Sequence, residues 1–495
     1  MRRWLIIGLL AGMAMVLRGQ ISGNNLFEYQ WGNLPHAAPA DLSAHYDQLN
    51  LQYRYKNLKA GLRYEHFFSQ TGGTSYYGIS QFNLRYRYEG LKVKAGHISE
   101  MLGNGLLFRA YEIPASVYEE EAYRVRYGFY RDLLGFSAQY MADHWYVKAL
   151  RGRSLNNTLP PTLEWQDRRP DLAEGLEGGV SFFDQTAGVI LFRNTNGETR
   201  SPFYSLLLEG NILAILSYNV EVAHNLSRDI APFDFGSDAR YGIYSSVSLN
   251  YRQVGLSVEF KNYQDMLIGS GVSDPPTLVK EHTYKLLNRS IHVPQYTNER
   301  GIQLEGYYAF SDGSRLLLNH ARAVNEFTRT FLFTEYFAEL TTYPGKNTTL
   351  TLFLDYAEDP FKGEKQRMTG GTLLETYLGN RWSGNLHAEY QHFKRTLGET
   401  IPVQNMAWII GVSKSPSLSV SLTWEISDDP LQREAVGIPG KWRHWLGSDI
   451  SYRLNNRNTL SLFVGQRRGG PACTSGICYE VLDFEGAEIR LTSKF

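Results

Sequence analysis

Residues 49–65 read LNLQYRYKNLKAGLRYE, and this stretch decides the fold. Apolar and polar side chains alternate along it, with Leu49, Leu51, Tyr53 and Tyr55 on one face and Asn50, Gln52, Arg54 and Lys56 on the other. A period of two belongs to a strand, because a helical face repeats every 3.6 residues. After a turn at Asn57 the alternation resumes, with Leu58, Ala60, Leu62 and Tyr64 opposite Lys59, Gly61, Arg63 and Glu65. The stretch therefore predicts a β-hairpin.

The same pattern recurs along the chain. It returns at 82–95, where apolar positions alternate with Asn83, Arg85, Arg87, Lys92 and Lys94 around a turn at Glu89-Gly90. Further short turns are predicted at 209–211, 253–255, 311–313, 344–347, 379–381, 414–416 and 455–458. Longer connections are predicted at 101–121, 154–175, 225–239, 265–300, 357–370, 428–446 and 466–486. Short turns on one side and long loops on the other are typical of outer-membrane barrels.

The predicted fold is an all-β, transmembrane, antiparallel up-and-down barrel over residues 20–495, with no N-terminal plug domain. Hairpins plus a first strand (26–31) and a last strand (487–495) give about 24 strands, within a range of roughly 20 to 26 because 131–150 forms one strand or two. The mean hydropathy of −0.34 does not oppose this fold, since a barrel averages lipid-facing against lumen-facing side chains. A soluble propeller would show a repeat of roughly 40–50 residues, and none is visible.

The first residues predict export. Arg2 and Arg3 precede an apolar run at 5–17, and Gly19 offers a small residue for cleavage, so 1–19 is predicted to be a signal peptide. The run is shorter than the ~17 residues of a membrane span. The last strand alternates and ends on Phe495, which resembles the signal read by the barrel-assembly machinery. We therefore expect the outer membrane, with lipid and that machinery as partners, long loops extracellular, and short turns and termini periplasmic.

The loop at 97–121 is the first candidate site. Gly103-Asn104-Gly105 offers positions that tolerate positive φ, so the chain can turn sharply there. One interpretation folds this loop into the lumen, with Arg109 and Glu112 facing the pore. The other is a packed turn with a solvated salt bridge, and we favour the second.

Charge on the inner face is the second candidate feature. Basic side chains gather on the first hairpins, at Arg54, Lys56, Lys59, Arg63, Arg85, Arg87, Lys92 and Lys94. Acidic groups follow at Glu119, Glu120, Glu121, Glu335 and Glu339. Opposed walls would set a field across the pore, as selective channels use. Equally, such charges pair across neighbouring strands.

The two cysteines, Cys473 and Cys478, lie close together in the connection before the last strand, and export favours a disulfide between them. The histidines, among them His144, His282, His292, His387 and His392, show no metal-ligand spacing, and no G-x-S-x-G motif is present. We therefore expect no metal, no cofactor and no enzyme activity. The balance of 50 basic and 50 acidic residues gives no reason to expect a nucleic-acid partner.

The loops at 97–121 and 467–478, the opening Ile21-Ser22-Gly23-Asn24 and the final Phe495 together resemble an uncharacterised family of Bacteroidota outer-membrane barrels with a domain of unknown function. The resemblance covers essentially the whole mature chain. It implies fold and localisation and carries no activity.

The leading functional hypothesis is a porin-like passive channel or transport component. A second is a scaffold or binding subunit of a cell-surface or secretion complex, with 265–300 as its contact loop through Pro275, Pro276, Tyr284 and Tyr296. A third, a barrel-embedded hydrolase, has no residue pattern in its favour.

Overall fold

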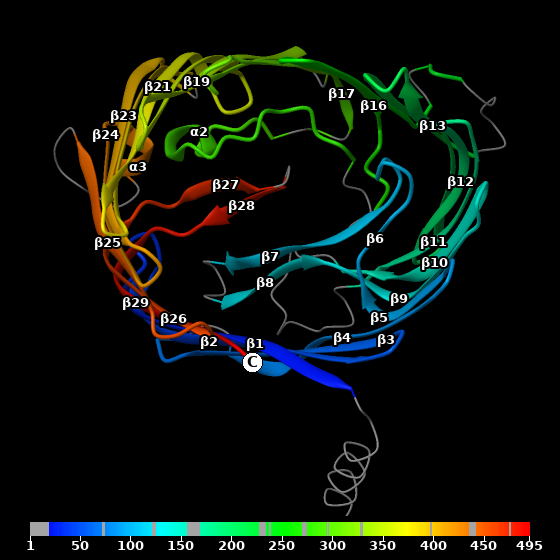
Figure 1. Ribbon diagram of the computed structural model, residues 1–495, viewed down its shortest axis with the longest axis horizontal. Coiled ribbons are helices and arrows are strands. Elements are labelled where there is room, and N and C mark those ends of the chain that lie inside the picture. The colour runs from blue at the N-terminus through cyan, green and yellow to red at the C-terminus, as the bar shows by residue number, and fades with distance from the viewer. Residues whose placement is uncertain are drawn as a thin grey trace, which may run out of the picture.

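The protein is a closed barrel of antiparallel strands (Figure 1). The structure is a computed structural model that describes residues 19–71, 75–120, 125–155, 169–226, 234–236, 239–269, 275–293, 295, 297–326, 330–396, 398–434, 442–474 and 477–495. One sheet holds 24 strands, and it closes because β1 pairs with β2 on one side and with β29 on the other. The prediction of an antiparallel barrel of about 24 strands is confirmed.

The wall strands follow one another around the barrel. They are β1 (Gln20–Asn33), β2 (Asp41–Tyr55), β3 (Leu58–Ser69), β4 (Tyr76–Tyr88), β5 (Leu91–Ile98), β9 (Leu133–Met141), β10 (Trp145–Ser154), β11 (Asp171–Phe182), β12 (Gln185–Asn196), β13 (Thr199–Ile212), β14 (Leu216–Asn225), β15 (Tyr241–Tyr251), β16 (Val254–Gln264), β17 (Asn298–Ala309), β18 (Arg315–Glu326), β19 (Thr330–Gly345), β20 (Thr348–Asp359), β21 (Glu364–Gly379), β22 (Trp382–Arg395), β23 (Ile401–Lys414), β24 (Leu418–Ser427), β25 (Arg443–Arg453), β26 (Asn458–Arg467) and β29 (Phe484–Lys494).

Two predicted connections are wrong. Residues 209–211 lie inside β13, where Gly210 is paired with Gln185, and the hairpin turns instead at Leu213 and Ala214. Leu213 and Ala214 have positive φ, 56° and 53°. Glycine and asparagine adopt this conformation more readily, so the residue preferences of hairpin turns favoured the Gly210 region instead. The predicted long loop at 357–370 is mostly strand, since β20 ends at Asp359 and β21 begins at Glu364.

Side chains alternate between the two faces of the wall as predicted. On β20 the exposed members are Leu352, Leu354 and Tyr356, and the buried members are Phe353, Asp355 and Ala357. Leu354 is 69% exposed, whereas Asp355 is 4% exposed. Large apolar side chains are exposed in the same way on strands around the whole barrel. Such a surface would drive aggregation in water and suits contact with lipid.

The described parts of three connections fold into the barrel and are named here the first, second and third lumen segments. The first (99–132) contains β6 (Glu100–Met101), β7 (Arg109–Glu120) and β8 (Val125–Arg131). The second (265–297) contains α2 (Lys285–Arg289), and the third (468–483) contains β27 (Gly470–Thr474) and β28 (Ile477–Val481). Helix α2 lies against β27, β28 against β7, and β8 against the wall strand β3, so the segments form a layer across the lumen (Figure 1).

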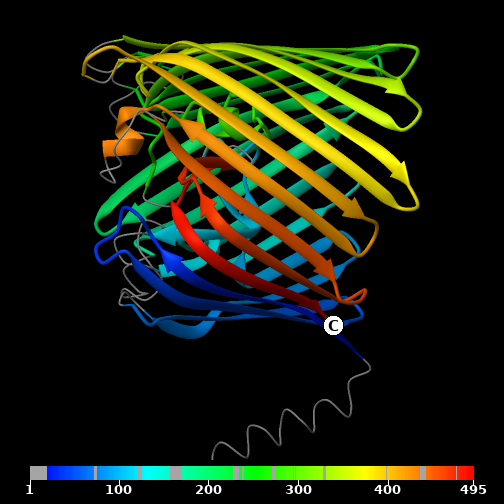
Figure 2. The same cartoon turned by 90° about the vertical axis from the view of Figure 1, so that its left-hand side faces the viewer.

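The two ends of the barrel differ. The C-terminus lies at the end that carries the short turns, and α3 (Pro430–Glu434) lies at the other end (Figure 2).

Among the described residues, no helix combines the length and the apolar character that a membrane span requires.

Candidate functional site in the lumen

The first lumen segment is attached to the wall through its glycine turn. Gly103 and Gly105 have φ of +49° and +85°, so the turn uses the backbone freedom that the sequence predicted. The Gly103 N–H donates to Glu177 Oε2 of β11 at 3.2 Å, and the Asn104 N–H donates to Glu221 Oε2 of β14 at 2.7 Å. Two wall carboxylates therefore bind the backbone of the turn.

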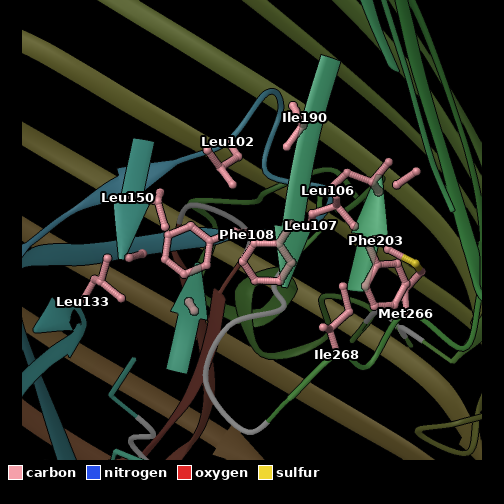
Figure 3. Close-up of a cluster of buried hydrophobic side chains, with 14 of the residues drawn as sticks. Leu102, Leu106, Leu107, Phe108, Leu133, Leu150, Ile190, Phe203, Met266 and Ile268 are labelled. Atoms are coloured by element: carbon pink, nitrogen blue, oxygen red, sulfur yellow. The ribbon is translucent and has the colours of Figure 1, made fainter. Parts of the chain in front are cut away.

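Apolar side chains around this turn pack against the inner wall (Figure 3). Leu102, Leu106, Leu107 and Phe108 are fully buried, and they form one cluster with wall residues that include Leu133, Leu150, Ile190 and Phe203. Burial of each such side chain contributes about 1.5–3 kcal/mol. The turn is therefore packed, as one interpretation predicted, and it lies inside the lumen, as the other predicted.

Arg109 and Glu112 do not form the solvated pair that the packed-turn interpretation supposed. Glu112 Oε1 accepts a hydrogen bond from Arg63 Nη2 of β3 at 2.6 Å, and the Arg109 guanidinium lies 4.9 Å from the Tyr111 ring centre. The contact between Glu112 and Arg63 joins the first lumen segment to the basic wall.

Four basic residues stand side by side on that wall. The strand register places Arg54 of β2 opposite Lys59 of β3, Lys59 opposite Arg85 of β4, and Arg85 opposite Lys94 of β5. We name these four residues the basic row. Like charges directly opposite each other destabilise a sheet by up to about 1 kcal/mol a pair. Arg87 and Lys92 form a second basic pair beside the row.

Three of the four residues of the basic row have no acidic partner among the described residues. Lys94 pairs with Glu100 of the first lumen segment at 2.6 Å. Within the described parts of the chain, no ion pair is made by Arg54, Lys59 or Arg85, and all three side chains are exposed. The three line a polar cavity of about 340 Å³ together with Arg63, and Glu112 and Asp132 contribute acidic groups to its lining. Neighbouring residues of β1 and β2, such as Gln20 and Gln52, complete the cavity.

The acidic side of the lumen is different, because its carboxylates are covered. Glu335 is 2% exposed and lies 3.0 Å from Arg367 and 3.3 Å from His282. Glu339 accepts a hydrogen bond from the Tyr284 hydroxyl at 2.6 Å. Glu121 and the side chains of Glu119 and Glu120 lie outside the described residues. The sequence predicted a basic wall and an acidic wall. Among their described residues, only basic side chains remain uncovered.

The second lumen segment covers that acidic side. The N–H groups of Lys285 and Leu286, at the start of α2, donate to the two carboxylate oxygens of Glu389 at 2.6 and 2.7 Å. Arg289 Nη1 lies 2.7 Å from Glu425 Oε2, and Lys285 Nζ lies 3.3 Å from Glu425 Oε1. Since both carboxylates belong to buried wall positions, charge and hydrogen bonding together fix α2 against β22 and β24.

Two buried networks continue from α2. Arg367 of β21 is fully buried and binds Glu335, Asp355 and Glu364, and it also donates to the Ser290 carbonyl at 2.8 Å. His292 lies 2.8 Å from Asp359 and 3.6 Å from Glu299. Burial lowers the pKa of His292, but the carboxylates of Asp359 and Glu299 outweigh burial, so its pKa is raised above the usual value.

This packing changes the role predicted for 265–300. Pro275 and Tyr284 are buried, and the Tyr284 ring stacks on Phe353 with 3.7 Å between ring centres. Pro276 is partly buried and accepts a hydrogen bond from Tyr263, whereas Tyr296 lies outside the described residues. The prediction of a surface contact loop is therefore wrong for its described part, because the wall offers it aromatic and ionic partners that solvent does not.

The third lumen segment is a hairpin whose base is fixed by Asp483. The Asp483 carboxylate accepts from the Gly469 N–H at 2.7 Å and from Arg443 at 3.0 Å. Cys473 of β27 lies opposite Cys478 of β28 in the strand register. Their side chains lie outside the described residues, so the disulfide stays a prediction that this register accommodates.

Several of these residues escaped the sequence analysis. Three of them, Glu389, Glu425 and Arg367, are far in sequence from the segments they bind. Each stands at an ordinary polar position of an alternating strand, so the local sequence does not show that it binds a lumen segment. The apolar run at 102–108 did give one, since four large apolar side chains in a predicted external loop indicate burial. Phe495 continues β29 by pairing with Gly23 through two backbone hydrogen bonds, and its ring is exposed.

The fold and lumen define a large β-barrel of the outer-membrane type. Residues 3–115 match the model of a family described as "Family of unknown function (DUF6029)", about a quarter of the chain. This confirms the predicted resemblance to a family of unknown function over that stretch, and the Bacteroidota origin stays a prediction. No protein of curated function matches the sequence.

Solved structures with a similar fold are outer-membrane proteins. The chain is similar to a cryo-EM structure of the E. coli P pilus tip assembly intermediate PapC-PapD-PapK-PapG, with a TM-score of 0.52, 9% identity, and coverage of 97% of this chain and 60% of that one. The P pilus usher (PapC) translocation pore gives a TM-score of 0.45 at 8% identity, covering 96% and 99%. Pseudomonas aeruginosa OccK5 gives 0.40 at 13% identity, covering 72% and 97%. At these identities the likeness concerns the fold alone.

Proposed function

We propose that the protein is an outer-membrane channel of restricted lumen that passes small anionic solutes along the basic row. The observation that carries the proposal is the row itself, four like charges on adjacent strands, three of them exposed and without an ion pair among the described residues. Because such an arrangement costs stability, it suggests a role for an unneutralised positive surface. Rings or rows of basic side chains select anions in other pores.

The lumen segments set the size of the solute. A barrel of 24 strands is wide enough to conduct water freely unless its interior is filled. Here three segments form a layer across the lumen, and the 340 Å³ cavity lies beside the basic row. A cavity of that volume suits a small organic anion rather than a polymer.

Planar-bilayer recording under a salt gradient tests this function. We expect the purified protein to form channels whose reversal potential shows anion preference. The variant R54Q/K59Q/R85Q should reduce or reverse that preference. The matched control R252Q/K346Q/R381Q removes three positive charges from short turns outside the row and should leave most of the preference. Absence of channels, or equal selectivity in both variants, contradicts the proposal.

A scaffold is the second candidate, because the layer of segments across the lumen also suits a barrel that conducts nothing. Stoichiometric co-purification of a partner, combined with silence in the bilayer, would favour it. A barrel-embedded hydrolase is the third candidate, and a lipid or ester turnover assay of the purified protein tests it.

The remaining expectations form part of the same proposal. We infer that 1–19 is a signal peptide and that assembly uses the terminal Phe495. Long connections would face the exterior, and short turns with both termini would face the periplasm. The exposed apolar wall supports insertion in lipid, and heat-modifiable migration of the folded protein on a denaturing gel tests that insertion.

A further inference from the structure

Three potential metal ligands meet where the second lumen segment joins the wall. His282 of the segment, Glu335 of β19 and Asp355 of β20 place one ligand atom each within 4.8 Å of one another. All three side chains are at least 96% buried. A tetrahedral zinc ion with bonds of about 2.1 Å needs ligand separations of roughly 3.4 Å, a contraction that small side-chain rotations supply.

The charge around this group is not balanced. Glu335, Asp355 and Glu364 contribute three carboxylates, and Arg367 contributes the one guanidinium that binds all of them. Among these four groups, two negative charges are in excess in a buried site, which is costly. The neighbouring cations His292 and Lys261 are engaged by carboxylates of their own, Asp359 and Glu299. A divalent cation would restore neutrality.

Two atoms of the group also lack partners. Asp355 Oδ2 and His282 Nδ1 are buried and accept or donate no hydrogen bond among the described residues. Arg367 contacts Asp355 through Oδ1, the other oxygen, so one lone-pair surface of Asp355 stays available. Arg367 thereby has the position of an outer partner that orients ligating carboxylates, as hydrogen-bond donors do around other metal sites.

We propose that His282, Glu335 and Asp355 bind one divalent transition-metal ion that fastens the second lumen segment to the wall. One imidazole and two carboxylates favour zinc over magnesium or calcium, because those harder ions prefer all-oxygen sites. The ion would join the segment to two wall strands, whatever the channel conducts. The inference therefore does not rest on the proposed transport function.

Zinc content after refolding tests the site. The full chain is refolded from urea into detergent with or without zinc chloride, heat-modifiable migration checks folding, and bound zinc is measured after removal of free ion. We expect one zinc per wild-type barrel and at least about 100-fold weaker binding in H282A and D355N. The matched control H97A removes a histidine of β5 that lines the polar cavity, and it should bind as wild type does. Wild-type binding no tighter than that of H282A overturns the proposal.

X-ray absorption at the zinc edge of the wild-type protein provides a second measurement that needs no variant. We expect nitrogen and oxygen ligands only. Sulfur ligands would place the ion at Cys473 and Cys478 and overturn the proposal. A competition in which magnesium displaces zinc at equal concentration would also overturn it, because an imidazole ligand would then have no part in binding.

Discussion

Replacing Glu389 by glutamine should loosen the attachment of α2 to the wall without unfolding the barrel. The helix begins at Lys285 without a capping bond from its own side chains and without an acidic residue in its first turn. Glu389 supplies what the helix lacks, since its two oxygens accept the N–H groups of Lys285 and Leu286 at 2.6 and 2.7 Å. A five-residue helix has little stability of its own, so this external cap decides whether it persists.

The size of the effect follows from those two bonds. A hydrogen bond to a charged group contributes about 1.5–3 kcal/mol. Glutamine keeps one oxygen acceptor but turns its NH₂ group toward the second N–H, so we expect E389Q to lose about one bond. A loss of about 2 kcal/mol multiplies the opening equilibrium of the segment roughly thirty-fold.

Hydrogen exchange read by mass spectrometry measures that opening. The informative amides are Asn288, which donates to Tyr284, and Ser290, which donates to Leu287, because both bonds lie within the segment. Their exchange should accelerate roughly thirty-fold in E389Q, while amides of the wall strands keep their rates. The control E174Q removes a more exposed carboxylate on β11 and should change nothing in the segment. Acceleration below about threefold would refute the capping role.

Three further predictions concern the other attachments. F108A should lower the free energy that holds the first lumen segment in place by about 3–5 kcal/mol. The Leu102 amide should then exchange faster, and an unchanged rate would show that the cluster contributes little. Since the pKa of His292 is raised, its contribution should be full below the unfolded value of about 6.5 and disappear as pH rises through the folded value. Exchange in the second segment, corrected for intrinsic rates, should therefore increase at alkaline pH, and H292Q should abolish that dependence. Alkylation of the unreduced, denatured chain should add no mass at Cys473 and Cys478, whereas two added groups would exclude the disulfide.

The wall of the barrel was predictable from sequence because each strand carries its own signal. Alternation at 49–65 assigns the lipid and lumen faces locally, and pairing of neighbours along the chain then fixes the order of the strands. The turn at Leu213 and Ala214 was missed because neither residue type indicates positive φ.

The interior of the barrel was not predictable in the same way. His282 meets Glu335 and Asp355 only after the second segment folds inward and the strands β19 and β20 pair. Ligand spacing rules apply to residues on one helix or turn, so they cannot detect this group. Glu389 and Lys285, likewise, come from distant parts of the chain, and a lone glutamate on a lumen face is an ordinary polar position.

The contrast between the two sides of the lumen is the strongest argument for transport over a purely structural role. Where a segment covers the wall, carboxylates such as Glu389 and Glu425 are engaged by groups of that segment. On the basic side, Arg63 and Lys94 receive carboxylates of the first segment, while Arg54, Lys59 and Arg85 stay exposed beside a cavity. A scaffold gains nothing from three repelling charges in its lumen, and a single acidic substitution would relieve them. A channel for anions needs such charges unneutralised, so this pattern of neutralised and unneutralised charge supports the proposed anion passage.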